Sequence, residues 1–177
     1  MTFSFKDLEK SKSVLLLMDA AEYQKITVDV IKNLVNKTVC YVTLNRTQDS
    51  LREIFEDRKV SLTDVVFIDG ITSSIKGVGK EEKGCYFISS PGAFTELSLA
   101  ISKFLRHNFD VLIFDSITNL STYRDKAVVE QFLLKLINEI GLSKKTKGIF
   151  YALNLDSEKN LIKMATSHVE KVVGPKF

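Results

Sequence analysis

The 177-residue sequence contains little cysteine, no long apolar run and no excess of either charge. Its two cysteines, Cys40 and Cys85, are too few for a disulfide framework or a zinc cluster, and both lie in apolar segments, where we expect small core residues. No uninterrupted apolar run exceeds the five residues of 14–18, whereas a membrane helix requires roughly 18. The composition therefore excludes a disulfide-stabilised scaffold and predicts no membrane span.

The balance of charge and apolar content is typical of an ordinary globular domain. The chain carries 25 Lys and Arg against 22 Asp and Glu, a net charge of +3, and 45% of its residues are apolar. Such a balance is a poor electrostatic footprint for a dedicated nucleic-acid binder. The first residues place charge where a secretory signal needs an apolar stretch, so we expect a cytoplasmic protein. We predict one domain over 1–177, with 1–11 as an N-terminal extension.

Short apolar runs alternate with helical patterns along almost the whole chain. The runs predict buried strands, because continuous apolar stretches of this length are typical of parallel strands covered on both faces. The expected strands are 14–18, 38–44, 64–69, 85–88, 110–115, 147–153 and a more polar edge strand at 168–173. Helical spacing between them predicts an α/β fold, a single doubly wound and mostly parallel sheet with helices on both faces.

Residue types also predict where several helices begin and end. Thr47 and Ser157 are suited to cap the starts of two helices, and Gly141 stands where the longest helix would end in a left-handed residue. The glycine-rich segment 70–84 has few apolar residues in its second half and is expected to form an exposed, mobile loop.

Asp115 is the most informative residue for function. Four apolar residues followed by an acid is how a nucleotide-hydrolysing enzyme presents a carboxylate to a magnesium-bound water. The alternative is a strand-end aspartate that caps the next turn. Ligands of open parallel sheets bind beyond the carboxyl ends of the strands, and Asp115 lies at such an end.

The segment 19–26 stands where a phosphate-binding loop of the form G-x-x-x-x-G-K-[ST] would follow the first strand. Lys25 occupies the lysine position, but neither glycine is present and the magnesium-binding hydroxyl is missing, although Thr27 could replace it. The loop normally needs glycine because its backbone adopts positive φ angles against the phosphates. We therefore expect the side chains of Glu22, Tyr23 and Gln24 to fill the space that a phosphate would occupy.

Residues 110–123, DVLIFDSITNLSTY, resemble the Walker B strand and turn of the KaiC-like branch of the RecA superfamily. Segments 41–44 and 86–99 support the resemblance, which extends over about residues 12–173. It implies a RecA-like P-loop fold, and in active members ATP and magnesium. The degenerate Walker A segment retains only Lys25, and Asn45 and Arg46 stand where the resemblance implies a catalytic pair of glutamates.

The resemblance and its departures together imply a non-catalytic KaiC/RecA-like protein, a pseudo-ATPase without catalytic residues or an expected cofactor. Members of this superfamily commonly form rings or filaments, so we expect a regulatory or assembly module that binds a protein partner or itself. The alternative is an atypical nucleotide-binding protein or slow ATPase. Its nucleotide contacts would be Lys25, Thr27, Asp115 and Ser116, with Asp115 holding the magnesium.

Two further alternatives are weaker. Nucleic-acid binding would use the residues after the Walker B strand, Tyr123, Arg124 and Lys126, or a second basic group at Lys144, Lys145 and Lys147. The simpler interpretation of these lysines is solvated surface. A phospho-signalling receiver would use Asp19, Asp69 and Ser89, which follow successive strands, but the lysine–proline step expected after its last strand is absent.

Overall fold

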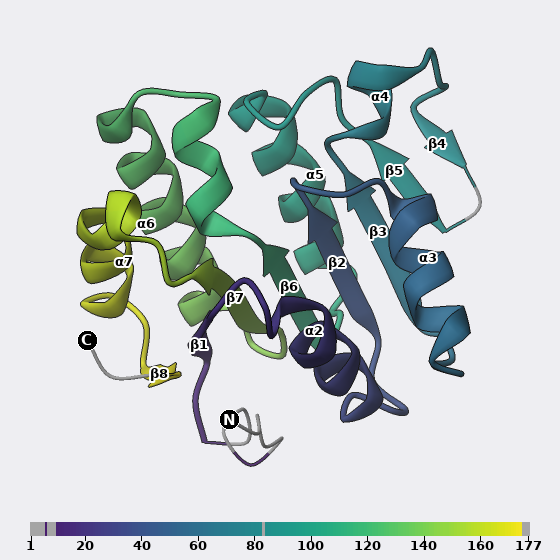
Figure 1. The fold of residues 1–177 in the computed structure, drawn as a ribbon, viewed down its shortest axis with the longest axis horizontal. Helices are drawn as coiled ribbons and strands as arrows, with labels where there is room; N and C mark the ends of the chain where they lie inside the picture. The colour runs from purple at the N-terminus through teal and green to yellow at the C-terminus, as the bar shows by residue number, and fades with distance from the viewer. Residues whose placement is uncertain (1–5, 7–9, 83, 175–177) are drawn as a thin grey trace.

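The computed structural model describes residues 6, 10–82 and 84–174, which form one sheet flanked by helices (Figure 1). Within them the sheet has eight strands in the order β4-β5-β3-β2-β6-β7-β1-β8, and every neighbouring pair is parallel except β4 and β5. The strands are β1 Ser13–Met18, β2 Val39–Thr43, β3 Val65–Asp69, β4 Glu81–Glu82, β5 Cys85–Phe87, β6 Val111–Asp115, β7 Lys147–Leu153 and β8 Lys171–Val173. The predicted doubly wound α/β fold is confirmed.

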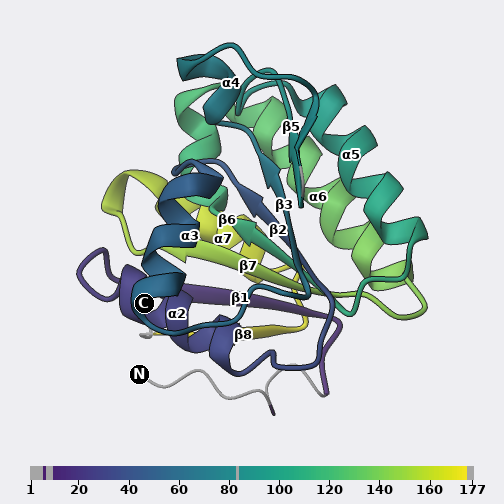
Figure 2. The ribbon, with the colours of Figure 1, turned by 90° about the vertical axis from the view of Figure 1, so that its right-hand side faces the viewer.

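Helices cover both faces of the sheet, as Figure 2 shows. The helices are α2 Tyr23–Lys32 and α3 Gln48–Asp57 on one face, α5 Phe94–Arg106, α6 Lys126–Leu142 and α7 Lys159–Thr166 on the other, and the short α4 Thr72–Ile75 after β3. Successive strand residues point to opposite faces. Leu15 and Leu17 of β1 therefore join the core under α5, α6 and α7, whereas Val14 and Leu16 join the core under α2 and α3.

The order of the strands creates a place for a site at the carboxyl edge of the sheet. After β2 the chain passes through α3 on one face, and after β6 it passes through α6 on the other face. Because β2 and β6 are neighbours, their outgoing chains separate at this edge, which is the position at which open parallel sheets bind ligands. Asp115 is the last residue of β6 and pairs in register with Thr43 of β2.

The predicted helix boundaries hold in one case and fail in two. The Thr47 hydroxyl accepts the backbone N–H of Ser50 at 3.2 Å, which confirms the cap of α3. Gly141 was expected to end a helix, but α6 continues to Leu142 and then turns into extended backbone at Ser143, so no left-handed residue is needed. The Ser157 cap is also wrong, because a turn of 3-10 helix, Asp156–Glu158, precedes α7.

Segment 70–84 contains more regular structure than a loop. Residues 76–82 are largely exposed, as expected, but α4 forms at its start and β4 pairs antiparallel with β5 near its end. The backbone N–H of Phe87 donates to the carbonyl of Lys80 at 2.8 Å and holds β4 against the sheet. The last strand lies at the sheet edge as predicted, although it spans only β8. Most of the predicted N-terminal extension, 1–5 and 7–9, lies outside the described residues.

Helix α3 ends in a left-handed residue that is not glycine. Lys59 has a φ of 55°, and the N–H of Val60 reaches back to the carbonyl of Phe55 at 2.9 Å, which closes the helix. A side chain in this conformation is strained because its Cβ approaches the backbone. Glycine removes that strain but also gains freedom in the unfolded chain.

We therefore predict that Lys59→Gly stabilises the fold by up to about 1 kcal/mol. Urea denaturation at neutral pH measures the effect. Lys163→Gly is the matched control, because Lys163 is an exposed lysine inside α7 and glycine there should destabilise by about 1 kcal/mol. Equal destabilisation by both substitutions would show that the Lys59 conformation is unstrained.

Candidate functional site

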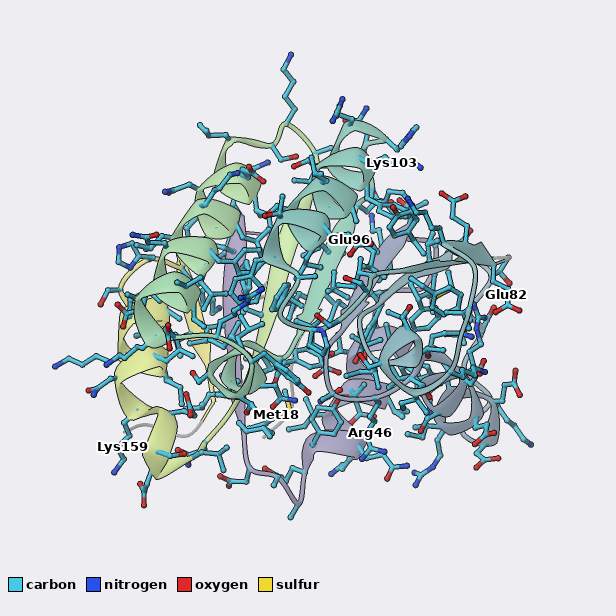
Figure 3. The ribbon with its side chains drawn as sticks, turned by 90° about the horizontal axis from the view of Figure 1, so that it is seen from above. Met18, Arg46, Glu82, Glu96, Lys103 and Lys159 are labelled. Carbon is cyan, nitrogen blue, oxygen red and sulfur yellow. The ribbon has the colours of Figure 1, made fainter. Side chains whose placement is uncertain are left out.

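The carboxyl edge of the sheet brings together side chains from three parts of the chain around Asp115. Tyr41 comes from β2, Tyr23 begins α2, and Asn45 follows β2. Figure 3 looks down on this edge and labels Met18 at the end of β1 and Arg46 just beyond β2. The guanidinium of Arg46 lies over the ring of Tyr23, with its central carbon 5.7 Å from the ring centroid.

The carboxylate of Asp115 is completely buried and is enclosed by hydrogen-bond donors. The hydroxyl of Tyr41 donates to its Oδ2 at 2.5 Å, and the hydroxyl of Tyr23 donates to the same oxygen. Asn45 donates through Nδ2 to Oδ1 at 3.1 Å. Burial raises the pKa of Asp115 to about 6, although these three donors and the charge of Arg46 oppose the shift. The carboxyl is therefore close to half protonated at mildly acid pH.

Three tyrosines surround this carboxyl and stay neutral. Burial, reinforced by the negative charge of Asp115, raises the pKa of Tyr23, Tyr41 and Tyr151 well above the usual value for a phenol. The ring of Tyr151 packs edge-on against both of the others, with ring centroids 6.5 Å from Tyr23 and 6.4 Å from Tyr41. Neutral phenols act here only as hydrogen-bond donors and acceptors, so the acid–base chemistry of this cluster near neutral pH belongs to Asp115 and not to the tyrosines.

The segment expected to correspond to a phosphate loop is a tight turn. The N–H groups of Glu22 and Tyr23 donate to the carbonyls of Asp19 and Ala20, at 2.9 Å and 3.4 Å. Residues 19–26 are all described, and none has a positive φ. The N–H groups of Glu22 and Tyr23 are thus engaged inside the turn and do not face outward to a phosphate. Tyr23 is buried under it, whereas Gln24 is exposed, so Tyr23 is the residue of the expected trio that enters the interior most deeply.

The predicted nucleotide contacts differ in burial and in their partners. Lys25 is exposed on α2, but Thr27 on the same helix is buried near Tyr151. Ser116 is buried, and its Oγ lies 3.1 Å from the hydroxyl of Thr118. Asp115 remains at the end of β6, engaged by the tyrosines and Asn45. Nucleotide or magnesium binding by these residues stays a prediction.

Three buried polar atoms next to Asp115 have no hydrogen-bond partner among the described residues. They are the hydroxyl of Thr27, Oδ1 of Asn45 and the hydroxyl of Tyr151. Thr27 is close enough to Tyr151 to lower the pKa of its phenol slightly, but the two hydroxyls do not reach hydrogen-bond geometry. Unpaired buried hydroxyls are unfavourable, so this corner of the site could accept further hydrogen bonds.

Tyr41 and Tyr151 are site residues that the sequence interpretation missed. Each lies within an otherwise apolar, fully buried strand. A buried phenol normally finds a polar partner, so a tyrosine inside such a strand indicates a polar group in the core. That signal was present in the sequence, but it does not identify Asp115 as the partner.

The residues of the receiver alternative are each engaged in local contacts. Asp69 accepts the N–H groups of Gln48, Ile71 and Thr72 at 2.7 to 2.9 Å and thereby caps two turns. Asp19 accepts from Asn154 at 3.1 Å, and Ser89 donates to Glu96 at 2.6 Å. This geometry is that of structural caps and gives no support to a phosphorylation pocket.

The residues of the nucleic-acid alternative are partly paired. Arg124 donates to the carbonyl of Gly92 at 2.7 Å, and Lys126 lies 3.8 Å from Glu130. In the second basic group, Lys145 pairs with Asp110 at 3.1 Å. Among the described residues no group of three or more His, Cys, Asp or Glu side chains is placed to hold a metal ion. No helix in the described part of the chain is long and apolar enough to cross a membrane.

The mostly parallel sheet and its strand order define a RecA-like α/β fold. One solved structure with this fold is a KaiC-like protein from the hyperthermophilic archaeon Pyrococcus horikoshii. The match covers 80% of this chain and 61% of that one, with a TM-score of 0.53 and 15% identity. No protein-family model and no curated protein sequence matches the chain. The predicted RecA-like, KaiC-like fold is confirmed.

The buried carboxyl predicts a specific pH dependence of stability. The pKa of Asp115 rises from 3.8 in the unfolded chain to about 6, so the folded chain binds more protons between these values. The contribution of Asp115 to stability therefore falls as pH rises through this window and is constant above it. As the pH rises from 4 to 7, we expect the free energy of unfolding of the wild type to fall by up to about 3 kcal/mol relative to that of Asp115→Asn. Urea denaturation at each pH measures this difference.

The control for this measurement is the exposed Asp156, whose hydrogen bond to Lys159 lowers its pKa. Asp156→Asn should change the pH dependence in the opposite direction or not at all. A wild-type and Asp115→Asn pair with parallel stability curves from pH 4 to 7 would contradict the raised pKa.

Removing one phenol hydroxyl tests the hydrogen bonds that surround the Asp115 carboxylate. Tyr23→Phe deletes a hydrogen-bond donor to Asp115. It should lower the free energy of unfolding by about 1.5–3 kcal/mol at pH 7.5, because the bond is made to a charged group. It should also raise the pKa of Asp115 further, which a ¹³C titration of the carboxyl measures. The control is Tyr123→Phe, at a half-exposed tyrosine. An unchanged Asp115 titration in Tyr23→Phe would rule out this contact.

Proposed function

We propose that this protein is a RecA-like domain that does not turn over nucleotide and that acts as a regulatory or assembly module by binding another protein or itself. The observation that carries the first part is the enclosure of the Asp115 carboxylate by Tyr23, Tyr41 and Asn45. In an active relative this carboxylate would face a hydrated magnesium ion. Here it faces two phenols and an amide.

Hydrolysis needs several groups that act together, and the described residues of this edge supply few of them. The turn 19–22 has no glycine, and the N–H groups of Glu22 and Tyr23 bond within it, which disfavours an amide cradle for a phosphate. Neither Asn45 nor Arg46 can serve as a carboxylate base. A single remaining group does not compensate for lost partners, because catalytic groups that form a unit act non-additively.

Exposed apolar side chains and the resemblance to ring- and filament-forming proteins support binding to another protein or to a second copy of this chain. Val35, Ile75, Leu99 and Leu142 are each more than 60% exposed. Single exposed apolar residues are common, but a protein partner would bury some of them. The two cysteines are free and buried, which suits a reducing compartment, and we place the protein in the cytoplasm.

A second candidate function is nucleotide binding without efficient hydrolysis. The observation in its favour is the group of unpartnered atoms on Thr27, Asn45 and Tyr151 beside Asp115. If Tyr23 turned outward, these atoms and the carboxylate would become available to a ligand and its magnesium ion, and the exposed Lys25 could reach a phosphate. The experiment below separates the two functions.

Thermal unfolding with and without millimolar Mg-ATP is the decisive measurement. A ligand at a hundred times its dissociation constant stabilises by about 2.7 kcal/mol, which for a domain of this size raises the midpoint by roughly 5–10 °C. We expect no such rise with ATP, ADP or GTP and no ATP hydrolysis above background. A rise that disappears in both Lys25→Ala and Asp115→Ala would establish the second function instead.

Light scattering coupled to size-exclusion chromatography, on the same samples, tests the binding part. Self-association predicts a mass above that of one chain, with or without nucleotide. A strict monomer that also fails to bind protein partners would contradict an assembly role.

A further inference from the structure

A groove lies at the amino edge of the sheet, opposite the Asp115 site and at the lower edge in Figure 1. It has a volume of about 460 Å³ and lies between the C-terminal ends of α2 and α3 and the first residues of β2 and β3. We call it the amino-edge groove and define it by Lys32, Leu34, Val35, Lys37, Lys59 and Val60. Its volume is within the range of ligand-binding sites.

The lining of the groove is mixed, and its apolar part includes Leu34, Val35 and Val60. Leu34 at the end of α2 and Val60 after α3 are buried, and they continue the core cluster that lies beneath these two helices. Val35 stands beside them, yet 69% of its surface is exposed. An apolar lining that leads to an exposed valine is suited to accept an apolar side chain from outside.

The rim of the groove is positively charged. Lys32, Lys37 and Lys59 line it against a single acidic residue, Asp64, so three positive charges face one negative charge. Lys32 and Lys59 form no ion pair with another residue in the described part of the chain, and both are exposed. The groove therefore offers two cations to an incoming anionic group.

The ends of the two helices do not cancel this charge. Helix C-termini carry partial negative charge on their last carbonyls. Here several of those carbonyls are engaged: those of Phe55 and Glu56 in α3 accept from Val60 and Lys59 at 2.9 Å, and that of Ile31 in α2 accepts from Leu34 at 3.0 Å. Closed helix ends leave the lysines as the dominant charges of the rim.

The same turns hold the rim in a defined shape. Asn36, after α2, has a φ of 64°, and Lys59, after α3, has a φ of 55°. The chain therefore passes through a left-handed residue after each of these helices, at the rim of the groove. Such turns have few alternative conformations, so the backbone that carries Lys37 and Lys59 is organised before any partner arrives. Preorganisation lowers the entropic cost of binding.

We propose that the amino-edge groove binds an acidic segment of a partner protein. The segment inserts an apolar side chain over Leu34, Val35 and Val60, and its carboxylates pair with Lys32 and Lys59. This inference rests on the proposed function as a protein-binding module and specifies where and through which chemistry it binds. Charge complementarity selects an acidic partner, and the apolar lining selects a segment that carries a large aliphatic or aromatic residue among its acids.

The test uses short fluorescein-labelled peptides and fluorescence anisotropy on the full chain at low salt. The first peptide has one Leu flanked by Asp and Glu, the second replaces Leu with Ser, and the third replaces the acids with Lys. We expect saturable binding of the first peptide, with binding weakened about tenfold or more in the other two, and weakened again at high salt. Amide NMR shifts should be confined to residues 31–39 and 59–65.

Variants at the rim make the test specific to this groove. Lys32→Gln combined with Lys59→Asn removes both charges, and Asn tolerates the left-handed conformation at position 59, so the fold should persist by circular dichroism. This variant should bind the first peptide about tenfold more weakly or worse. Lys163→Gln, at an exposed lysine on the opposite face, is the matched control and should bind as the wild type does.

Three results would overturn the proposal: no saturable binding of the acidic Leu peptide, equal binding of the Leu and Ser peptides, or NMR shifts centred outside the groove. These failures differ from a failure of the proposed function. If the peptides do not bind but light scattering shows assembly, the groove is wrong and the module still binds through another surface. If Mg-ATP binds and is hydrolysed, the proposed function fails whatever the peptides do.

Discussion

The buried carboxylate of Asp115 is the constraint on which the carboxyl edge of this fold depends. A carboxylate with no exposed surface must be hydrogen-bonded, protonated or both. Two phenols and an amide satisfy it, and they come from α2, β2 and the segment after β2. The bond from Tyr23 ties α2 to the centre of the sheet, so this carboxylate helps to hold the fold together.

The two edges of the sheet are consequently different. At the carboxyl edge, where open α/β sheets usually bind their ligands, the side chain of Tyr23 is buried, and the N–H groups of Glu22 and Tyr23 bond within the turn. At the amino edge, the ends of α2 and α3 leave a lysine-rimmed groove with an apolar lining. The proposed function and the proposed groove would together assign protein binding to the amino edge and no nucleotide turnover to the carboxyl edge.

Much of the fold was predictable because buried strands have a strong pattern. The apolar runs at 14–18, 110–115 and 147–153 correspond to β1, β6 and β7 to within one residue at each end. Helix ends were harder to predict, as Gly141 and Ser157 show, because a chain can leave a helix through extended backbone or enter one through a 3-10 turn without the residue that propensity favours. Of the site, Asp115 and the loss of the phosphate-loop glycines could be identified from local residue types.

The sequence by itself determined the fold class, the place of Asp115 at a strand end and the absence of a glycine-rich phosphate loop, because each depends on neighbouring residues. Only the tertiary structure decided that Tyr23, Tyr41 and Asn45 converge on one carboxylate and that Lys32 and Lys59 share a groove. These residues are separated by many positions in the chain. Strand order and helix packing bring them together, and no local pattern contains that information.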